Sequence, residues 1–462
     1  MSTNVVILAA GLGTRMKSKR AKVLHRAGGL TLVEHVANAA LGITSPDRVV
    51  VVVGHQADEV IATLEPKGVR FAKQTEQKGT GHAVMMCRDA LEGDSGLVMV
   101  LYGDCPLLSA DTLERLRCAQ ERSDAAATLI TTRLDDPTGY GRVLLDEGGN
   151  VRAIVEQKAA TTEQLAVRLI NSGIYCFRSE LLWRYVGEIR PDNPACEYYL
   201  TDLAEILNRA GHRVAALEID NPQELLGINT RIELAEVDRI LRERKARELM
   251  AGGVTIEKPE TVVIDAPVRI GIDTIIEPFT RITGDTVIGE DCRIGAGSVI
   301  ANSRLADRVE VAPYTSIADS RIETGARVGP YARLRMGAQV ERDAHIGNFV
   351  ELKKTRLGAC AKASHLAYLG DADIGAGVNI GAGTITCNYD GVRKHPTKIG
   401  EGAFVGSNST LVAPVEVGAN SYIGAGSVVT EPVPPEALAL GRARQVVKEG
   451  WVRRRRNRMQ AS

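Results

Sequence analysis

The chain has 462 residues, 44% of them hydrophobic and 25% charged, so it can bury more than one core and we expect two folded domains. Its 57 basic residues equal its 57 acidic residues, which excludes the overall field typical of proteins that bind nucleic acid or anionic membranes. The apolar runs are too short to span a membrane, no secretory signal is visible, and the eight cysteines form no C-x-x-C pair. We therefore expect a cytoplasmic protein with reduced thiols and without membrane insertion.

Residues 1–231 alternate short apolar runs with helix-like segments. The runs VVILAA, RVVVVVG and GLVMVLYGD have the length of buried strands, and LVEHVANAAL has the pattern of a crossover helix. This alternation predicts an α/β domain with a doubly wound, Rossmann-like sheet. Residues 232–252 combine aliphatic positions with dense charges of both signs and end at a glycine pair, which predicts a linker helix.

Residues 253–462 show an aliphatic residue about every six positions, as at Ile288, Ile294 and Ile300. A six-residue repeat of this kind predicts a parallel β-helix, whose handedness the spacing does not fix. Two segments break the repeat. TCNYDGVRKHPTK must leave the stack as a loop, and residues 352–374 bring polar side chains into an irregular stretch.

The segment NVVILAAGLGTRMKS runs from an apolar strand into a glycine-rich turn. It lacks the last glycine of a dinucleotide motif and the G-K-[ST] of a P-loop. What remains is backbone that can approach a ligand at Gly11 and Gly13, with Arg15 and Lys22 to meet negative oxygens. We expect a nucleoside triphosphate; the alternative is a tight turn with surface bases.

Three further side chains lower the weight of that alternative. Asp104 ends an apolar strand at the sheet edge where α/β proteins hold ligands, and a carboxylate there suits Mg²⁺, although it could also be a helix N-cap. Asn229 precedes the linker helix and could merely cap it. Gln74 offers an amide to a pyrimidine edge, beside the flexible backbone of Gly79 and Thr80.

The ordered set LAAGLGTRM…K, Q-x-E-x-x-G-T-G, YGD, GYGR, VEQK, INSGIY and GIN, followed by HLAYLGD and GAGTITCNYDG, resembles the bacterial family of bifunctional N-acetylglucosamine-1-phosphate uridyltransferase/glucosamine-1-phosphate acetyltransferases. The resemblance covers nearly the whole chain. It implies acetyl transfer from acetyl-CoA to glucosamine 1-phosphate, then uridylyl transfer from UTP to N-acetylglucosamine 1-phosphate. The products are pyrophosphate and UDP-N-acetylglucosamine, a precursor of peptidoglycan and lipopolysaccharide. It also implies a homotrimer of left-handed β-helices with acetyltransferase sites between subunits.

The resemblance assigns the uridyltransferase site residue by residue. Positions matching the nucleotide side are Leu8, Ala9, Ala10, Gly11, Lys22, Gln74, Gly79 and Thr80. Positions matching the sugar side are Tyr102, Gly103, Asp104, Gly139, Glu156, Asn171 and Asn229, with Asp104 and Asn229 as the Mg²⁺ ligands. Ala21 stands where the family usually has proline, and Gly29-Leu30 where it usually has Lys-Pro, which could displace Lys22.

Acetyl transfer to an amine needs a base, and neutral histidine suits this role because its pKa lies near working pH. His365 is the candidate, and by resemblance it matches the proton acceptor, whereas His345 is expected to be structural. Positions matching the sugar phosphate site are Arg335, Lys353, Tyr368 and Asn379. Positions matching the acetyl-CoA site are Ala382, Asn388, Tyr389, Ser407, Ala425 and Arg442.

Several alternatives stay open. The β-helix could serve assembly alone, in a sugar nucleotidyltransferase with a single activity, or the whole chain could be a scaffold without catalysis. Spacing does not distinguish UTP from dTTP, or N-acetylglucosamine from glucose. The basic tail WVRRRRNRMQ could be solvated, or it could be an arm that meets CoA phosphates or a neighbouring subunit.

Overall fold

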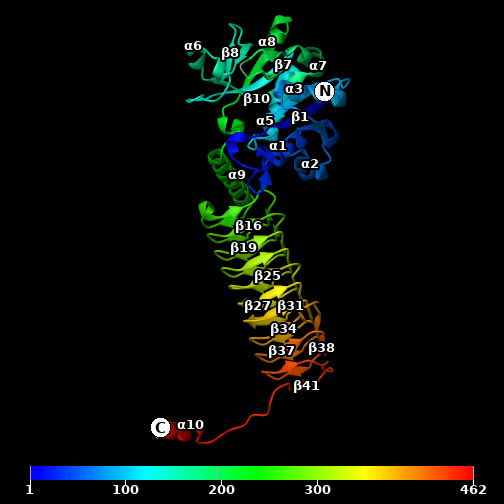
Figure 1. The fold of residues 1–462 in the computed structure, drawn as a ribbon, viewed down its shortest axis with the longest axis vertical. Coiled ribbons are helices and arrows are strands. Elements are labelled where there is room, and N and C mark those ends of the chain that lie inside the picture. Colours follow the sequence, from blue (N-terminus) through cyan, green and yellow to red (C-terminus); the bar gives the residue numbers. More distant parts are fainter. Residues whose placement is uncertain (1, 194, 461–462) are drawn as a thin grey trace. The chain divides into compact units, whose positions relative to one another are not determined.

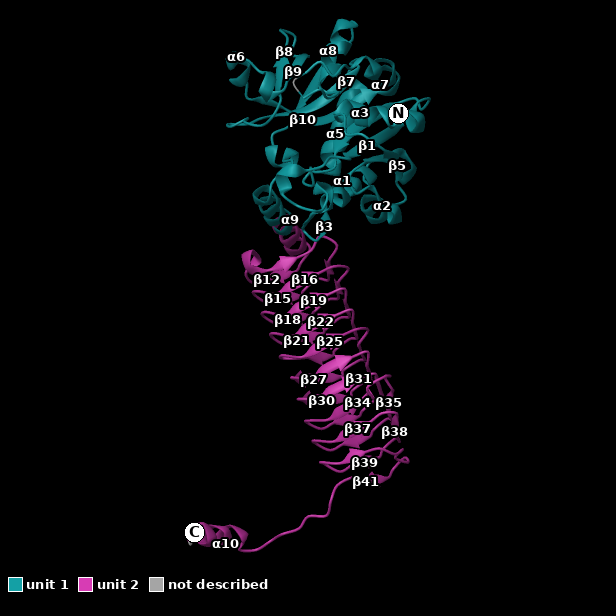
Figure 2. Ribbon diagram, in the orientation of Figure 1, with its two compact units in different colours: residues 1–242 teal, residues 243–462 magenta. Residues whose placement is uncertain are grey.

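The computed structural model describes residues 2–193 and 195–460. The chain forms two compact units, residues 1–242 and 243–462 (Figure 2). Helix α9 (Arg231–Ala251) begins in unit 1 and ends in unit 2. Val237 and Ile240 belong to a buried cluster of unit 1, and Ala246 and Leu249 belong to the core of unit 2. Each end of the helix is therefore held by apolar packing inside its own unit.

Unit 1 is built on a mixed nine-stranded sheet (Figure 1). The strand order is β11-β7-β10-β6-β1-β4-β5, with the hairpin β8/β9 attached to β10. Strand β1 is parallel to β4 and β6, and β10 is antiparallel to β6 and β7. The strands are β1 (Thr3–Ala9), β4 (Val49–Val53), β5 (Arg70–Lys73), β6 (Leu97–Tyr102), β7 (Ala127–Arg133), β8 (Arg142–Leu145), β9 (Val151–Val155), β10 (Leu169–Arg178) and β11 (Val214–Glu218).

Both faces of this sheet are covered by helices. Alternate residues of β1 enter different cores: Val5 and Ile7 pack in one buried cluster and Val6 in another. Because both faces are buried, the central strands β4 and β6 are almost entirely apolar, as the sequence predicted for a doubly wound sheet. One core includes residues of α1 (Leu32–Leu41), α2 (Ala57–Leu64) and α5 (Ala110–Arg122). The other includes residues of α3 (Thr80–Met85), α4 (Arg88–Leu91), α7 (Ser179–Tyr185) and α8 (Asp202–Arg209). Short α6 (Thr162–Leu165) follows the hairpin.

Unit 2 is a left-handed parallel β-helix of hexapeptide repeats, whose strands form three sheets. Figure 1 shows its coils stacked one on the next. The first sheet contains eleven strands from β12 (Thr255–Ile256) to β41 (Leu438–Ala439). The second contains ten strands from β13 (Val263–Ile264) to β40 (Val428–Val429), and the third nine from β14 (Arg269–Ile270) to β38 (Val415–Val417). The aliphatic residue of each hexad points inward: Ile288, Ile294 and Ile300 are at most 2% exposed. Coil upon coil of such residues forms one continuous core.

Two parts of unit 2 depart from the stack. Residues 388–396 leave it as a loop, closed by a bridge between Tyr389 and Lys394, as the break in the repeat predicted. After β41 an irregular segment leads to α10 (Trp451–Gln460), whose residues are all exposed. The basic tail is thus helical within the described residues, with the Arg455 guanidinium 5.1 Å from the centre of the Trp451 ring. Among the helices described, none has the length and apolar character needed to cross a membrane.

Candidate functional sites

The glycine-rich turn after β1 opens onto a cavity of about 380 Å³ in unit 1. Gly13 has a φ of 63°, and a Cβ there would lie 2.6 Å from Lys22 Cβ, so glycine is required for the turn to pack against Lys22. Gly11 has no neighbouring atom where a Cβ would stand, which leaves room for a ligand. Ten of the predicted residues line this cavity: Leu8, Ala9, Ala10, Gly11, Lys22, Gln74, Gly79, Thr80, Tyr102 and Asp104.

Gln74 and the start of α3 form one wall of the cavity. The Gln74 side chain is 3% exposed, and its Nε2 donates to the Gly79 carbonyl at 3.1 Å and lies 3.0 Å from His82 Nδ1. Thr80 Oγ1 accepts from the Leu200 backbone N–H at 3.0 Å. These bonds hold an amide and a helix N-terminus at the cavity, where they could meet a base and phosphate oxygens.

Lys22 and Asp104, which line the cavity, meet Asn229 and Arg15 beside it. Lys22 Nζ forms an ion pair with Asp104 and lies 3.2 Å from Asn229 Oδ1, which also accepts from Arg15 Nη2 at 2.7 Å. Neither ligand candidate serves as a helix cap: Ser109 caps α5, and the N–H of Glu233 bonds to Thr230 Oγ1 at the start of α9. The alternative that Asp104 and Asn229 are only helix N-caps is therefore not supported.

The Asp104 carboxylate and the Asn229 amide oxygen both contact the Lys22 ammonium. The same two oxygens could bind a small divalent metal ion. Mg²⁺ takes one or two carboxylates and completes its shell with phosphate oxygens and water. The described residues contain no group of three or more His, Cys, Asp and Glu side chains that could hold a metal alone. A metal at Asp104 and Asn229 would thus depend on oxygens from a bound nucleotide.

The remaining predicted residues of unit 1 lie outside the lining of this cavity: Gly103, Gly139, Glu156, Asn171 and Asn229. Asn229 contacts Lys22, which lines the cavity. Glu156 and Asn171 flank Gly141, whose missing Cβ would lie 3.5 Å from Glu156 Oε1 and 3.7 Å from Asn171 Cβ. Tyr175 Oη donates to Asn171 Oδ1 at 3.1 Å.

Burial changes the pKa values of Glu156 and Tyr102. It raises the pKa of Glu156, and the nearby Asp202 carboxylate raises it further. Burial also raises the pKa of Tyr102, with added contributions from Glu156 and Asp104. Glu156 is thus close enough to influence the pKa of Tyr102, which lines the cavity.

Sequence reasoning missed six lining residues: Leu12, Thr14, Val23, Gln77, Ala83 and Glu197. Leu12, Thr14 and Gln77 stand inside motifs that already suggested a site, whereas Glu197 comes from a distant segment without a local signal. Ala21 does not displace Lys22: its φ of −55° and ψ of 141° match the backbone that proline would adopt.

His365 stands at the surface of unit 2, at the end of β30 (Lys362–His365). It pairs in register with Asn348, the last residue of β27 (His345–Asn348), one coil away. The His365 Nδ1 lies 3.0 Å from Asn348 Oδ1. The imidazole is therefore outside the packed interior of the β-helix and available to a ligand.

Basic residues gather on the second sheet of unit 2. Arg335 on β25 (Arg333–Arg335) is in register with Lys353 on β28 (Glu351–Lys353), and Arg335 Nε donates to Glu351 at 2.7 Å. Lys353 is 6% exposed, with its Nζ 3.8 Å from an Asp371 carboxylate oxygen. Tyr368 on β31 (Tyr368–Gly370) pairs with Glu351. Three of the four predicted sugar phosphate residues thus share one sheet.

Lys394, in the loop that leaves the stack, is a residue that sequence reasoning missed. The nearby Lys353 lowers the pKa of Lys394, and Asp371 and Tyr368 partly offset this effect. Two ammonium groups held together favour an anion between them. The signal available in the sequence was the break in the repeat, which contains this lysine.

Asn379 does not join that group. It lies on β33 (Asn379–Ile380) of the first sheet, in register with Lys362 and Phe404. Two of the predicted acetyl-CoA residues, Ala382 and Ser407, lie at turns that stack on one another between coils. The carbonyl of Ala382 accepts from the Asn408 N–H at 2.7 Å, and that of Ser407 accepts from the Gly426 N–H at 2.8 Å.

The rest of the acetyl-CoA set lies near the C-terminal end of the β-helix and in the loop. Ala425 precedes Gly426, whose missing Cβ would lie 4.0 Å from Arg442 Cδ. Asn388 and Tyr389 lie in the loop, with Asn388 Nδ2 donating to Asp371.

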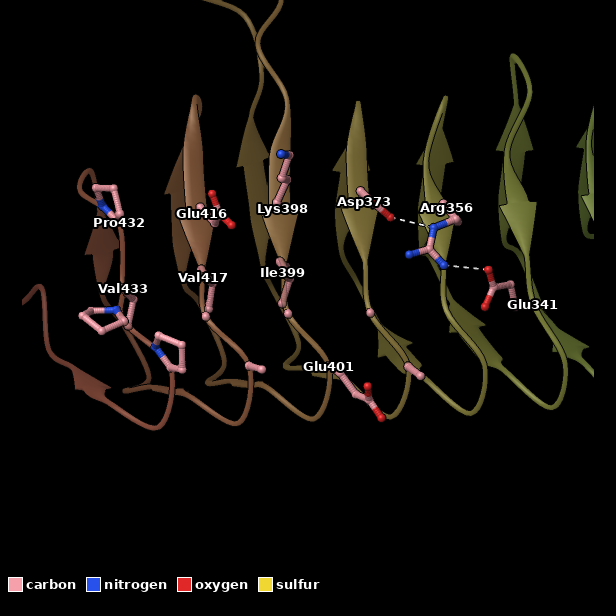
Figure 3. Close-up of a pocket in the computed structure, with 17 residues that line it drawn as sticks. Glu341, Arg356, Asp373, Lys398, Ile399, Glu401, Glu416, Val417, Pro432 and Val433 are labelled. Atoms are coloured by element: carbon pink, nitrogen blue, oxygen red, sulfur yellow. Dashed lines mark hydrogen bonds and ion pairs between the residues drawn. The ribbon is translucent and has the colours of Figure 1, made fainter.

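A cavity of about 720 Å³ lies on the third sheet (Figure 3). In its lining, Arg356 donates to Glu341 and to Asp373, each at 2.6 Å. It contains none of the predicted site residues.

Comparisons with known proteins match a different family to each of the two units. Residues 5–167 match the MobA-like NTP transferase domain, and residues 267–302 and 396–431 match the bacterial transferase hexapeptide family. The chain thus joins a nucleotidyltransferase to a hexapeptide-repeat transferase.

Full-length relatives share both parts. Bifunctional protein GlmU of Solibacter usitatus is 60% identical over 98% of this chain and 97% of its own length. Those of Koribacter versatilis and Anaeromyxobacter sp. strain Fw109-5 are 51% and 53% identical over 99% and 98% of this chain, and 98% and 92% of their own lengths. The chain belongs to the GlmU family of bifunctional enzymes and carries out uridylyl transfer and acetyl transfer.

Proposed function

We propose that the cavity of unit 1 is the uridyltransferase site and that its reaction depends on Mg²⁺ held by Asp104 and Asn229. The observation that carries this proposal is the convergence of Lys22, Asp104 and Asn229 beside the glycine-rich turn. Attack of the phosphate of N-acetylglucosamine 1-phosphate on the α-phosphorus of UTP forms one P–O bond and breaks another, releasing pyrophosphate. Such chemistry needs alignment and charge neutralisation more than a covalent nucleophile.

The residues present match those needs. Gly11 and Thr80, at the start of α3, line the cavity, and we assign their backbone N–H groups to phosphate oxygens, with positive charge from Lys22 and Arg15. The metal would neutralise the charge of the triphosphate. Lys22, which pairs with Asp104 here, can turn to a phosphate when the metal takes its place. Glu156 and Asn171 are assigned to the sugar, which they can select by hydrogen bonding.

In unit 2 we assign His365 as the base of acetyl transfer. Its imidazole takes a proton from the ammonium of glucosamine 1-phosphate, and the amine attacks the thioester carbon of acetyl-CoA. A C–N bond forms, the C–S bond breaks, and CoA leaves as a thiol once its sulfur is protonated. Arg335, Lys353 and Tyr368 bind the sugar phosphate, and Ala382, Asn388, Tyr389, Ser407, Ala425 and Arg442 bind acetyl-CoA. The acetylated product then serves unit 1, and UDP-N-acetylglucosamine results.

We further assign the functional form as a homotrimer in which a second copy completes the acetyltransferase site. His365 ends a strand of the first sheet and Tyr368 begins a strand of the second, so the candidate site wraps an edge of the β-helix. An edge is convex and cannot enclose a substrate by itself. The same part of the coil exposes apolar side chains in nearby coils: Tyr314 and Tyr331 stack at 5.3 Å, Tyr331 and Phe349 at 5.5 Å, and Leu366 is 62% exposed. Such a column favours coverage by protein.

One experiment separates the two sites. Pyrophosphate release and CoA release are measured on the same preparations of the wild type, His365→Ala and Asp104→Asn. We expect His365→Ala to lose CoA release alone and Asp104→Asn to lose Mg²⁺-dependent pyrophosphate release alone. Unchanged CoA release by His365→Ala would instead favour an enzyme whose β-helix serves assembly.

A further inference from the structure

His365 needs a defined tautomer to act as a base. A neutral imidazole has one nitrogen that donates and one that accepts, and only the accepting nitrogen can take a proton. The structure places Asn348 Oδ1 3.0 Å from His365 Nδ1. An amide oxygen only accepts hydrogen bonds, so Nδ1 must carry the proton in this contact. The lone pair is then on Nε2, directed away from Asn348.

We propose that Asn348 is the positioning residue for the acetyltransferase base: it fixes His365 in the Nδ1–H tautomer and holds the ring at the edge of the β-helix. This inference rests on the proposed role of His365. When Nε2 takes the proton of the substrate ammonium, the bond from Nδ1–H to Asn348 becomes charge-assisted and strengthens. Asn348 thus stabilises the state that forms during reaction without touching the substrate.

The backbone holds the two side chains together. Asn348 and His365 are register partners on adjacent parallel strands, and the carbonyl of Asn348 accepts from the Leu366 N–H at 3.0 Å. The preceding residue, Gly347, permits this approach, because a Cβ on Gly347 would collide with the Ser364 carbonyl. The contact is therefore set by the stacking of two coils and not by a flexible loop.

A neutral amide has a consequence that a carboxylate would not have. A carboxylate beside an imidazole favours the imidazolium and raises its pKa, which would leave less of the base unprotonated at neutral pH. Asn348 fixes the tautomer without that charge. Of the neighbouring titratable groups, Lys362 on β30 is cationic. His345 on β27 favours the neutral form, because burial and the charges of Arg327, Lys362 and His365 lower its pKa. The adjacent strand β33 presents the uncharged Asn379 in that row.

The test compares Asn348→Ala, Asn348→Asp and His365→Ala in the full chain. Gln339→Ala, which removes an exposed amide from β26 (Gln339–Val340) on the third sheet, is the matched control. CoA release is followed against pH at saturating and limiting substrate, and pyrophosphate release reports intact folding of unit 1. For Asn348→Ala we expect kcat for acetyl transfer to fall by about tenfold or more with KM for acetyl-CoA within about twofold, because the base is misoriented rather than the ligand lost.

Asn348→Asp should keep much of the rate at high pH but move the acid limb of kcat/KM upward by about one pH unit. In the His365→Ala background, Asn348→Ala should cost nothing further, since residues that act as one unit are not additive. An unchanged kcat in Asn348→Ala, or an unmoved acid limb in Asn348→Asp, overturns the positioning role. Retained CoA release in His365→Ala would instead overturn the proposed base, so the two failures are distinguishable.

Discussion

Replacing Gly79 by alanine should impair unit 1 through two separable effects. Gly79 precedes α3 with φ 103° and ψ 178°, a conformation that costs a residue with a Cβ about 1–3 kcal/mol. The added Cβ would also lie 2.7 Å from the Tyr198 carbonyl oxygen and 2.9 Å from the Tyr198 nitrogen. Both are backbone atoms, so the segment that carries Glu197 in the cavity lining must move.

Gly93→Ala is the matched control for strain without collision. Gly93 has a φ of 100°, and a Cβ there would meet no atom within 4 Å. For a unit of 242 residues, about 1–3 kcal/mol corresponds to a fall in Tm of roughly 2–12 °C, which we expect for Gly93→Ala with little loss of activity. Gly79→Ala should be at least as destabilised and also lose about 100-fold in kcat/KM for pyrophosphate release, since a shift of about 1 Å at a reacting site can cost that much.

The assay is differential scanning fluorimetry together with both product-release measurements on each variant. CoA release should stay within about twofold of the wild type in both variants, because neither residue belongs to unit 2. Equal kcat/KM for pyrophosphate release in the two variants would refute the argument from collision at the cavity.

Three other predictions concern charge and metal. Burial raises the folded-state pKa of Glu156, so stability from this group is present below the unfolded pKa and is lost as the pH rises through the folded pKa. Glu156→Gln lacks that loss, so its Tm should match the wild type near pH 4 and exceed it at pH 7; an equal Tm at both would contradict the assignment. Lys394→Ala should raise KM for glucosamine 1-phosphate by about tenfold, as expected on loss of a charge-assisted bond, whereas Lys398→Ala on the third sheet should not. Equal KM values would remove Lys394 from the site. Chelation of divalent metal with EDTA should stop pyrophosphate release and spare CoA release, and restoration by Mg²⁺ is the check; loss of both products would contradict separate metal use.

The fold could be predicted because its signals are local and repeated. Both faces of the central sheet are buried, so the strands of unit 1 stand out as apolar runs. The β-helix repeats one inward aliphatic residue every hexad, and the core of unit 2 confirms that pattern. The antiparallel course of β10 was not predicted, because a strand's direction depends on its partner and not on its own residues.

The sites were predictable where a motif holds several of their residues in one turn. Gly11 and Lys22 come from such a stretch, and Gln77 could have been added from the same kind of motif. Glu197 and Lys394 could not be assigned by spacing, because their neighbours come from distant parts of the chain. The contact between Asn348 and His365 depends on register between coils, which a period alone does not give.

The two units solve the problem of positioning in different ways. In unit 1, the ends of parallel strands and the start of α3 meet at one sheet edge, so a single unit surrounds most of its candidate ligand. A β-helix offers no such edge, because each strand continues into the next coil and the interior is filled with aliphatic side chains. Its chemistry must lie on the outside, where register aligns side chains from successive coils, as it aligns Arg335 with Lys353 and Asn348 with His365. Side chains aligned on a convex surface are ordered, but they do not enclose a substrate. The other side of the acetyltransferase site must therefore come from the loop that carries Lys394 or from a second copy of the chain.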